Sequence, residues 1–173
     1  MSFNPSSTTK ERLAFIDLEA SGLSDKSWPV EVGWAFCEGA ASSILICPDE
    51  KWPDDAWSNE AEALHGLSRD HLRKEGVAAR KVCAALNKAL SGCAAYSDAP
   101  DWDGFWLYRL FDAAKVKQTF SVLNFADLVR RQITGREQEV ISEANRLAPR
   151  RHRAADDALN LQMIYRLAIK STD

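Results

Sequence analysis

The stretch that decides the fold is Leu13-Ala-Phe-Ile-Asp-Leu-Glu-Ala-Ser-Gly-Leu23, which has the pattern of a buried β-strand but contains two acids. Residues two apart on a strand point to the same face, so Asp17 and Glu19 should lie side by side, about 7 Å apart. Two carboxylates this close attract a cation. Because the strand then breaks at Ser21-Gly22, the pair predicts half of a site for hard, oxygen-preferring divalent metals. An exposed strand end with two ordinary acids is the alternative.

Composition places the chain among ordinary globular proteins. Its 173 residues are 46% hydrophobic and 27% charged, which suits one domain over 11–173 after a flexible leader over 1–10. We expect a cytoplasmic protein without membrane contact, because no apolar run could cross a bilayer and no secretory signal is recognisable. The cysteines lack Cys-x-x-Cys spacing, which favours reduced core thiols over a zinc site or disulfides. They are Cys37, Cys47, Cys83 and Cys93.

Charge is distributed unevenly along the chain. The net charge of −3 argues mildly against a nucleic-acid partner. However, residues 49–62 contain six acids and one lysine, whereas residues 130–153 contain seven arginines and three glutamates. This basic sector predicts contact with phosphates, and a solvated surface of mixed charge is the alternative.

The order of strands and helices predicts an α/β fold. Strands are expected at the opening segment and at 30–37, 42–47, 93–97 and 119–124. Helices are expected at 56–64, 68–72, 77–90, 101–114, from 126 onward, at 142–148 and at 154–168. This order predicts a five-stranded mixed sheet, three antiparallel strands followed by two parallel ones, flanked by helices. The natural site lies where the parallel strands end, which is where the strand with Asp17 and Glu19 ends.

A third acid follows the fourth predicted strand. On a helix, Asp103 begins an apolar stripe that continues through Trp106, Leu107 and Leu110, so its carboxylate is expected to turn inward. Asp98 is the rival, because it lies before this helix and could serve as a cap or as a ligand.

The last predicted helix supplies a fourth acid and a histidine. Asp157 shares its helical face with Leu161 and Ile164, whereas Asp156 lies on a more mixed face, so Asp157 is the inward acid. His152, in the turn before this helix, can reach the same space as a general base. A surface histidine beside arginines is the alternative.

Together these segments resemble the three motifs of the DEDDh family of 3′-5′ exonucleases. The motifs are 15–23, Trp102-Asp103, and His152 with Asp157 five positions later. The same likeness extends to proofreading-exonuclease subunits, oligoribonuclease and ribonuclease T. It implies a ribonuclease H-like fold and two-metal phosphodiester hydrolysis with Mg²⁺ or Mn²⁺ and His152 as base. The implied metal ligands are Asp17, Glu19, Asp103 and Asp157.

The resemblance also implies a substrate, a nucleic acid with a free 3′ end that is cut to 5′-mononucleotides. Single-stranded DNA or frayed 3′ ends are favoured, because the His65-Gly66 loop resembles one in the proofreading branch. Short RNA is an alternative substrate, and a non-catalytic nucleic-acid-binding module is a third reading. The family often has histidine or asparagine near Asp98 and Ala99, so this chain departs there. Expected substrate contacts are Ala20, Ser21, Gly22, Leu23, Leu64, His65, Trp102, Arg150 and Arg151.

Repulsion among the four acids sets an energetic condition. Carboxylates within about 6 Å of one another repel by roughly 2–3 kcal/mol per pair at an effective dielectric of about 20, and four acids make six such pairs. That sum is comparable to a typical net stability of about 5–15 kcal/mol. We therefore expect the acids to hold protons, to splay apart or to recruit cations.

Overall fold

A single mixed sheet forms the centre of the molecule. The computed structural model describes residues 12–170, so the predicted leader lies outside this range. The sheet has the strand order β3-β2-β1-β4-β5. Its antiparallel part is β1–β2–β3, and β4 and β5 add on in parallel. The predicted fold class and strand arrangement are confirmed. The strands are β1 (Arg12–Ala20), β2 (Pro29–Phe36), β3 (Ser42–Leu45), β4 (Cys93–Ser97) and β5 (Ser121–Asn124).

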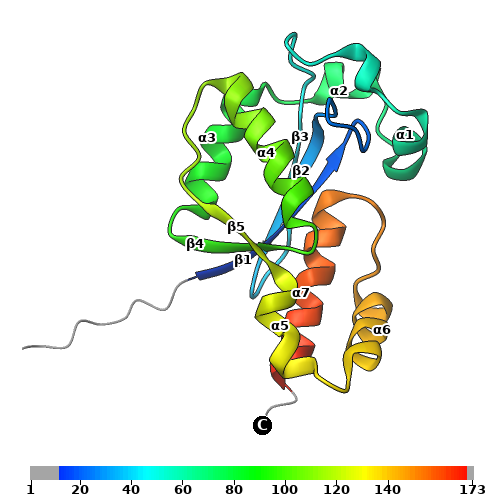
Figure 1. The fold of residues 1–173 in the computed structure, drawn as a ribbon, viewed down its shortest axis with the longest axis vertical. Helices are drawn as coiled ribbons and strands as arrows, with labels where there is room; N and C mark the ends of the chain where they lie inside the picture. The colour runs from blue at the N-terminus through cyan, green and yellow to red at the C-terminus, as the bar shows by residue number, and fades with distance from the viewer. Residues whose placement is uncertain (1–11, 171–173) are drawn as a thin grey trace, which may run out of the picture.

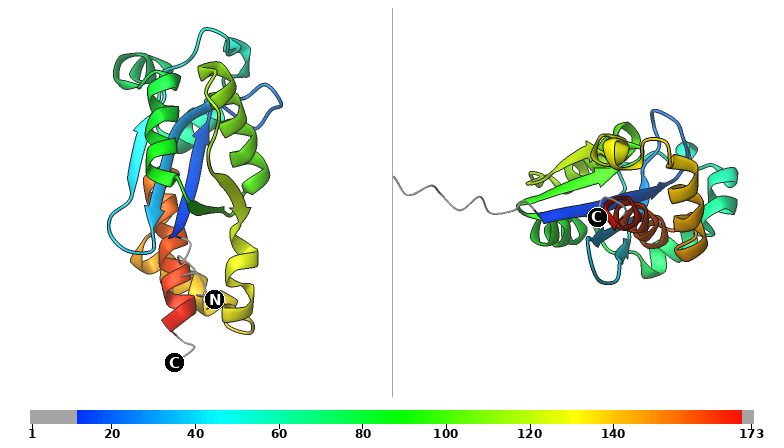
Figure 2. Two further views of the ribbon diagram at one scale, coloured as in Figure 1. Left: turned by 90° about the vertical axis from the view of Figure 1, so that its left-hand side faces the viewer. Right: turned by 90° about the horizontal axis from the view of Figure 1, so that it is seen from below.

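Helices cover both faces of this sheet (Figure 2). Helices α5, α6 and α7 gather at one end of the molecule, and α1 and α2 lie at the other (Figure 1). The helices are η1 (a 3₁₀ turn, Asp54–Ala56), α1 (Asn59–His65), α2 (Arg69–Glu75), α3 (Ala79–Leu90), α4 (Pro100–Ala114), α5 (Phe125–Ile133), α6 (Glu137–Leu147) and α7 (Ala154–Lys170).

Two predicted helix starts were wrong. The helix expected from residue 56 begins at Asn59, because Ala56 ends the 3₁₀ turn and Ser58 caps α1 by accepting a hydrogen bond from the Ala61 N–H at 3.2 Å. The helix expected from residue 142 begins already at Glu137. Val140, one turn before the buried Ala144, is itself buried, so the apolar face of α6 starts earlier than predicted.

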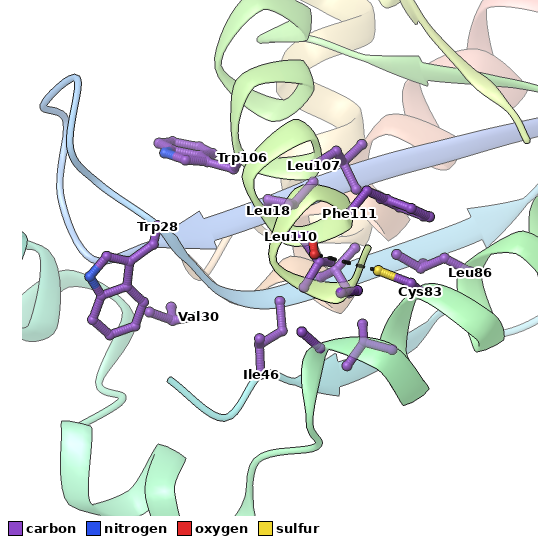
Figure 3. Close-up of a cluster of buried hydrophobic side chains, with 14 of the residues drawn as sticks. Leu18, Trp28, Val30, Ile46, Cys83, Leu86, Trp106, Leu107, Leu110 and Phe111 are labelled. Atoms are coloured by element: carbon purple, nitrogen blue, oxygen red, sulfur yellow. Dashed lines mark hydrogen bonds between the residues drawn. The ribbon is translucent and has the colours of Figure 1, made fainter. Parts of the chain in front are cut away.

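The two faces of β1 are buried in different clusters. Ala14, Ile16 and Leu18 pack into the larger one, beneath α3 and α4, where the Cys83 thiol lies 3.7 Å from the Leu110 carbonyl oxygen (Figure 3). Phe15 points the other way and packs against residues of α5, α6 and α7. Since side chains alternate along a strand, the acids at positions 17 and 19 share the face of Phe15 and point towards α7.

The end of β1 is paired with β2 but extends beyond its pairing with β4. Pairing with β4 ends at Phe15 and Tyr96, whereas pairing with β2 continues to Ala20. Asp17 and Glu19 therefore stand beyond the last residue pair with β4. In an open α/β sheet, this is the edge at which ligands bind.

Two further expectations can be compared with the structure. Cys83 and Cys93 are buried, as predicted for core thiols, whereas Cys37 and Cys47 are only half-buried. Among the helices within residues 12–170, none has the length and apolar character needed to cross a bilayer.

Gly33 allows β2 and α7 to approach closely, and replacing it should be costly. A Cβ atom at this position would lie 2.2 Å from the carbonyl carbon of Ala154 and 2.4 Å from the nitrogen of Ala155. We expect Gly33→Ala to lower the free energy of unfolding by about 1–3 kcal/mol or more, because helix backbone cannot yield as a flexible side chain does.

Urea unfolding measures this loss of stability, and Gly104→Ala is the matched control for Gly33→Ala. A Cβ on Gly104, inside α4, would meet nothing within 4 Å. Gly104→Ala should therefore be neutral or stabilise by up to about 1 kcal/mol through helix propensity. Equal stability of the two variants would contradict the close contact between β2 and α7.

Candidate active site

Four carboxylates converge where β1 ends. Asp17 on β1, Asp103 in the first turn of α4 and Asp157 in the first turn of α7 are only 8%, 1% and 3% exposed. Glu19 is half-buried. The inward positions expected for Asp103 and Asp157 are therefore observed, and their role as metal ligands stays a prediction. Three separate segments of the chain contribute to one acidic site.

Asp103 is held by the end of β4. The Ser97 hydroxyl donates to Asp103 Oδ2 and accepts from the Ala99 N–H at 2.9 Å. The backbone of Leu18 supplies a further hydrogen bond to the carboxylate. Sequence analysis missed Ser97, although a small polar residue closing an otherwise apolar strand is a usable signal. These bonds tie the acid on α4 to β1 and β4.

Asp157 is held by the turn that precedes α7. Its Oδ1 accepts from the Arg151 N–H at 2.9 Å. His152, the next residue, has a φ of 53°, a left-handed conformation that costs a non-glycine residue on the order of 1–3 kcal/mol and is found mainly at functional sites. One ligand atom each from Glu19, His152 and Asp157 lie within 4.8 Å of one another. The histidine is exposed, yet its ring faces the acids.

Arg150 supplies a positive charge inside this cluster. Its guanidinium donates to Asp98 Oδ2 at 2.6 Å and to Asp157 Oδ2 at 3.3 Å, and lies 3.8 Å from Asp17 Oδ1. Burial lowers the pKa of Arg150, but the bond to Asp98 and the attraction of these acids outweigh it, so the pKa is raised. The sequence predicts that the acids recruit cations, but it was not predicted that an arginine side chain of the protein itself would be one of them. Asp98, the rival of Asp103, is an ion-pair partner here.

Burial and mutual repulsion raise the pKa values of three of the acids. Burial, followed by repulsion from Asp103, Glu19 and Asp157, raises the pKa of Asp17 well above its usual value. Burial and then Asp157 and Glu31 raise the pKa of Glu19 to about 8. Burial raises the pKa of Asp103 to about 7, against the opposing effect of the Ser97 hydrogen bond. One arginine therefore does not neutralise the site.

The donor set suits hard divalent ions. Oxygen atoms of four carboxylates are the ligands that Mg²⁺ and Mn²⁺ prefer, whereas a zinc site would draw on cysteine and histidine. The close approach of Glu19, His152 and Asp157 shows that side chains of β1 and α7 can reach one ion. The residues present thus fit a site for divalent metal, and the two ions that the resemblance implies stay a prediction.

A pocket of about 270 Å³ adjoins the acids and contains Glu19 in its wall. Two of its residues, Leu23 and Leu64, are 76% and 56% exposed, so large apolar side chains stand at its rim. This is an open surface on which a flat, apolar ligand face can pack. Five predicted substrate contacts line it together: Ala20, Gly22, Leu23, Leu64 and His65.

Two predicted substrate contacts lie elsewhere. Ser21 is fully buried, and its hydroxyl donates to the Ala56 carbonyl and accepts from the Trp28 N–H, both at 3.0 Å, which is a structural role. Trp102 does not line the pocket. Its ring stacks on Trp106, which does. Trp106 was missed, although it shares the helical face of the acid three residues before it.

His65 contributes a buried, neutral ring to the pocket wall. Its Nδ1 accepts from the Leu67 N–H at 3.0 Å, which assigns the proton of the neutral ring to Nε2. Burial lowers the pKa of His65 and favours this neutral form. Nε2 is buried and makes no hydrogen bond within the described residues. The His65 ring is thus part of the pocket wall, with this nitrogen shielded from solvent.

The predicted basic sector is largely neutralised by neighbouring acids. Arg130, Arg136 and Arg146 each pair with an acid three residues away. In the part of the chain that the structure describes, only Arg131 and Arg151 of the seven arginines form no ion pair within 4 Å. Arg151 is exposed and next to the acids, so it is the cation best placed for a phosphate.

Comparisons with known proteins identify the fold. No protein-family model and no curated protein matches this sequence. Exonuclease I from Methylocaldum szegediense is 13% identical with a TM-score of 0.71, over 92% of this chain and 40% of that one. The zinc-bound E. coli exonuclease I complex with single-stranded DNA is 12% identical with a TM-score of 0.68, over 95% and 41%. The predicted ribonuclease H-like fold is confirmed, and the chain spans about two fifths of these neighbours.

The raised pKa values predict that the metal-free protein loses stability as the pH rises. An unfolded glutamic acid releases its proton near 4.5, whereas folded Glu19 keeps it to about 8. Folding therefore takes up protons between these values, with a slope of up to about 1.4 kcal/mol per pH unit for each proton. In EDTA, the urea midpoint should fall across this window, and Glu19→Gln should flatten the curve. Glu50→Gln, at an exposed site, is the control. Parallel curves for all three proteins would refute the assignment.

Proposed function

We propose that this protein is a metal-dependent 3′-5′ exonuclease that releases 5′-mononucleotides from single-stranded DNA or frayed 3′ ends. The convergence of four carboxylates from β1, α4 and α7 with a histidine at the open end of β1 carries the proposal. A surface cluster of acids would be solvated, whereas three of these are buried at a cost that bound divalent cations would offset.

The residues divide into those that hold ions and one that moves a proton. Asp17, Glu19, Asp103 and Asp157 would hold two divalent ions, which when bound activate water and stabilise the charge on the leaving 3′ oxygen. His152 is the proton acceptor: it is exposed, within 4.8 Å of two of the acids, and free to accept from a water that attacks phosphorus. The P–O3′ bond breaks as the new P–O bond forms, and the phosphate stays on the released nucleotide.

The pocket beside Glu19 would receive the 3′-terminal nucleotide. Its rim offers Leu23 and Leu64 for packing against a base, and the ring of His65 forms part of its wall. Arg151, which is exposed and next to the acids, would contact a phosphate. Neighbouring structures of E. coli exonuclease I contain dT13 and dA16 oligonucleotides, which supports DNA as the substrate class.

A nuclease assay tests the proposal and separates it from the alternatives. The purified protein with Mg²⁺ or Mn²⁺ should shorten 3′-labelled and 5′-labelled single-stranded DNA from the 3′ end, and Asp17→Ala should abolish this. Matched RNA oligomers in the same assay decide between a DNA and an RNA enzyme. Binding without cleavage by both wild type and Asp17→Ala would overturn the proposal in favour of a binding module.

Two variants separate proton transfer from metal binding. His152→Ala should lose about 10²–10⁴-fold in kcat, the usual contribution of a general base, while its affinity for Mn²⁺ stays close to that of the wild type. Asp157→Asn should weaken Mn²⁺ binding itself, because a neutral amide is a poorer ligand for a hard cation. Calorimetric titration with Mn²⁺ and single-turnover kinetics measure the two effects. Equal metal affinity in both variants would reverse the assignment of roles.

A further inference from the structure

Glu31 is a fully buried carboxylate close to the acidic site but outside it. It lies on β2 directly opposite Glu19 and is only 1% exposed. It accepts hydrogen bonds from Arg153 Nε and Nη2, both at 2.9 Å, and from the Ala154 N–H and the Ser43 hydroxyl, both at 3.0 Å. Four donors thus compensate one charge, as burial of a carboxylate requires.

These bonds fix the backbone on the C-terminal side of His152. Arg153 follows the histidine directly, and Glu31 binds both its guanidinium and the amide of the next residue. On the N-terminal side, the Arg151 amide donates to Asp157. His152 therefore sits between two residues that are each held by a buried carboxylate, and it keeps a left-handed φ of 53°. A residue in this conformation persists only when its surroundings determine it.

We propose that Glu31, acting through Arg153, is a positioning residue that holds His152 in place to accept the proton. This role rests on the proposed exonuclease function. It means that a residue of β2, which is not itself a proposed metal ligand, holds the proposed general base in position. Bidentate pairing is suited to the task because it fixes orientation as well as distance. Arg153 has a side chain that is 41% exposed, so its direction is set by the buried partner.

A purely structural role for Glu31 is the competing explanation, because the same bonds join α7 to β2. The chain offers a matched control in Gln162, which is also buried and joins the same helix to the same strand. Its side chain donates to the Phe36 carbonyl at 2.6 Å and to the Gly39 carbonyl at 3.1 Å, about two turns beyond the start of α7 at Ala154. Loss of this bond weakens the interface between α7 and β2 without touching the turn.

The test compares Glu31→Gln with Gln162→Leu on single-stranded DNA. Glu31→Gln keeps the shape of the side chain and removes the charge that orients Arg153. We expect kcat to fall about 10²-fold, the effect of misplacing a reacting group by about 1 Å, with KM unchanged within about threefold. Gln162→Leu should lower the melting temperature and leave kcat at the wild-type level. A similar loss of kcat in Gln162→Leu would show that any weakening of the interface suffices, and would overturn the proposal.

The route through His152 is tested by a double-mutant cycle. In the His152→Ala background, Glu31→Gln should cost nothing further, because the group that it positions is gone. An undiminished loss in that background would overturn the proposal. Glu31→Gln could also act by weakening metal binding at Glu19, which lies opposite, and Mn²⁺ titration tests this. Full recovery of the rate of Glu31→Gln at saturating Mn²⁺ would count against positioning.

A second variant covers the case in which Glu31→Gln fails to fold. Should Glu31→Gln not fold, Arg153→Lys is the second variant, since lysine keeps the charge without the two-pronged geometry and should show the same selective fall in kcat. An inactive wild-type protein would remove the exonuclease proposal itself. An active wild type together with near-normal kcat in Glu31→Gln and Arg153→Lys would remove only the positioning role.

Discussion

The crowding of negative charge at the end of β1 is the constraint on which the rest of the site depends. Two of the three buried acids have hydrogen-bond donors of their own: the Ser97 hydroxyl and the Leu18 backbone for Asp103, and the Arg151 amide for Asp157. These donors satisfy individual oxygen atoms, yet they carry no full positive charge. The raised pKa values of Asp17, Glu19 and Asp103 reflect their burial first and then the repulsion that remains among the acids. A site built in this way gains from divalent cations far more than from further hydrogen bonds.

The topology brings this charge together at one edge. β1 runs past the end of its parallel neighbour β4, and α4 begins soon after β4 ends. The first turn of α4 therefore lies against the end of β1, where Asp103 is bonded to the Leu18 backbone. α7 arrives from the far end of the sequence, and two features of β2 draw its first turn close. Gly33 leaves room for the backbone at Ala154, and Glu31 binds the amide of that same residue. Strand β2 therefore shapes the site although it contributes none of the proposed ligands.

Which acids point inward could be predicted from the periodicity of strands and helices in the sequence. Which residues they and their neighbours contact could not. Alternation along a strand placed Asp17 and Glu19 on one face, and helical periodicity chose Asp103 and Asp157 as inward acids, because burial follows from local pattern. Trp106 rather than Trp102 lines the pocket, and Ser21 serves the fold, because those outcomes depend on which distant residues lie opposite. Glu31 gave the same signal as Asp17, an acid in an apolar strand. Pattern reveals that such an acid is buried, but only the fold reveals that Arg153 compensates it.

Arg150 and Arg153 both pair with carboxylates, but the two ion pairs differ in how easily they can be released. Arg153 binds a carboxylate that is 1% exposed through two parallel hydrogen bonds, so releasing it would leave a buried charge without a partner. Arg150 spreads its guanidinium over Asp17, Asp98 and Asp157, and its strongest partner, Asp98, is about one third exposed. An ion pair that open is worth little in water, so Arg150 can release Asp98 at small cost, whereas Asp17 and Asp157 are buried and need another cation in its place. The turn before α7 thus has one fixed anchor and one exchangeable cation, and a divalent ion that takes over the carboxylates of Asp17 and Asp157 would displace the second without disturbing the first.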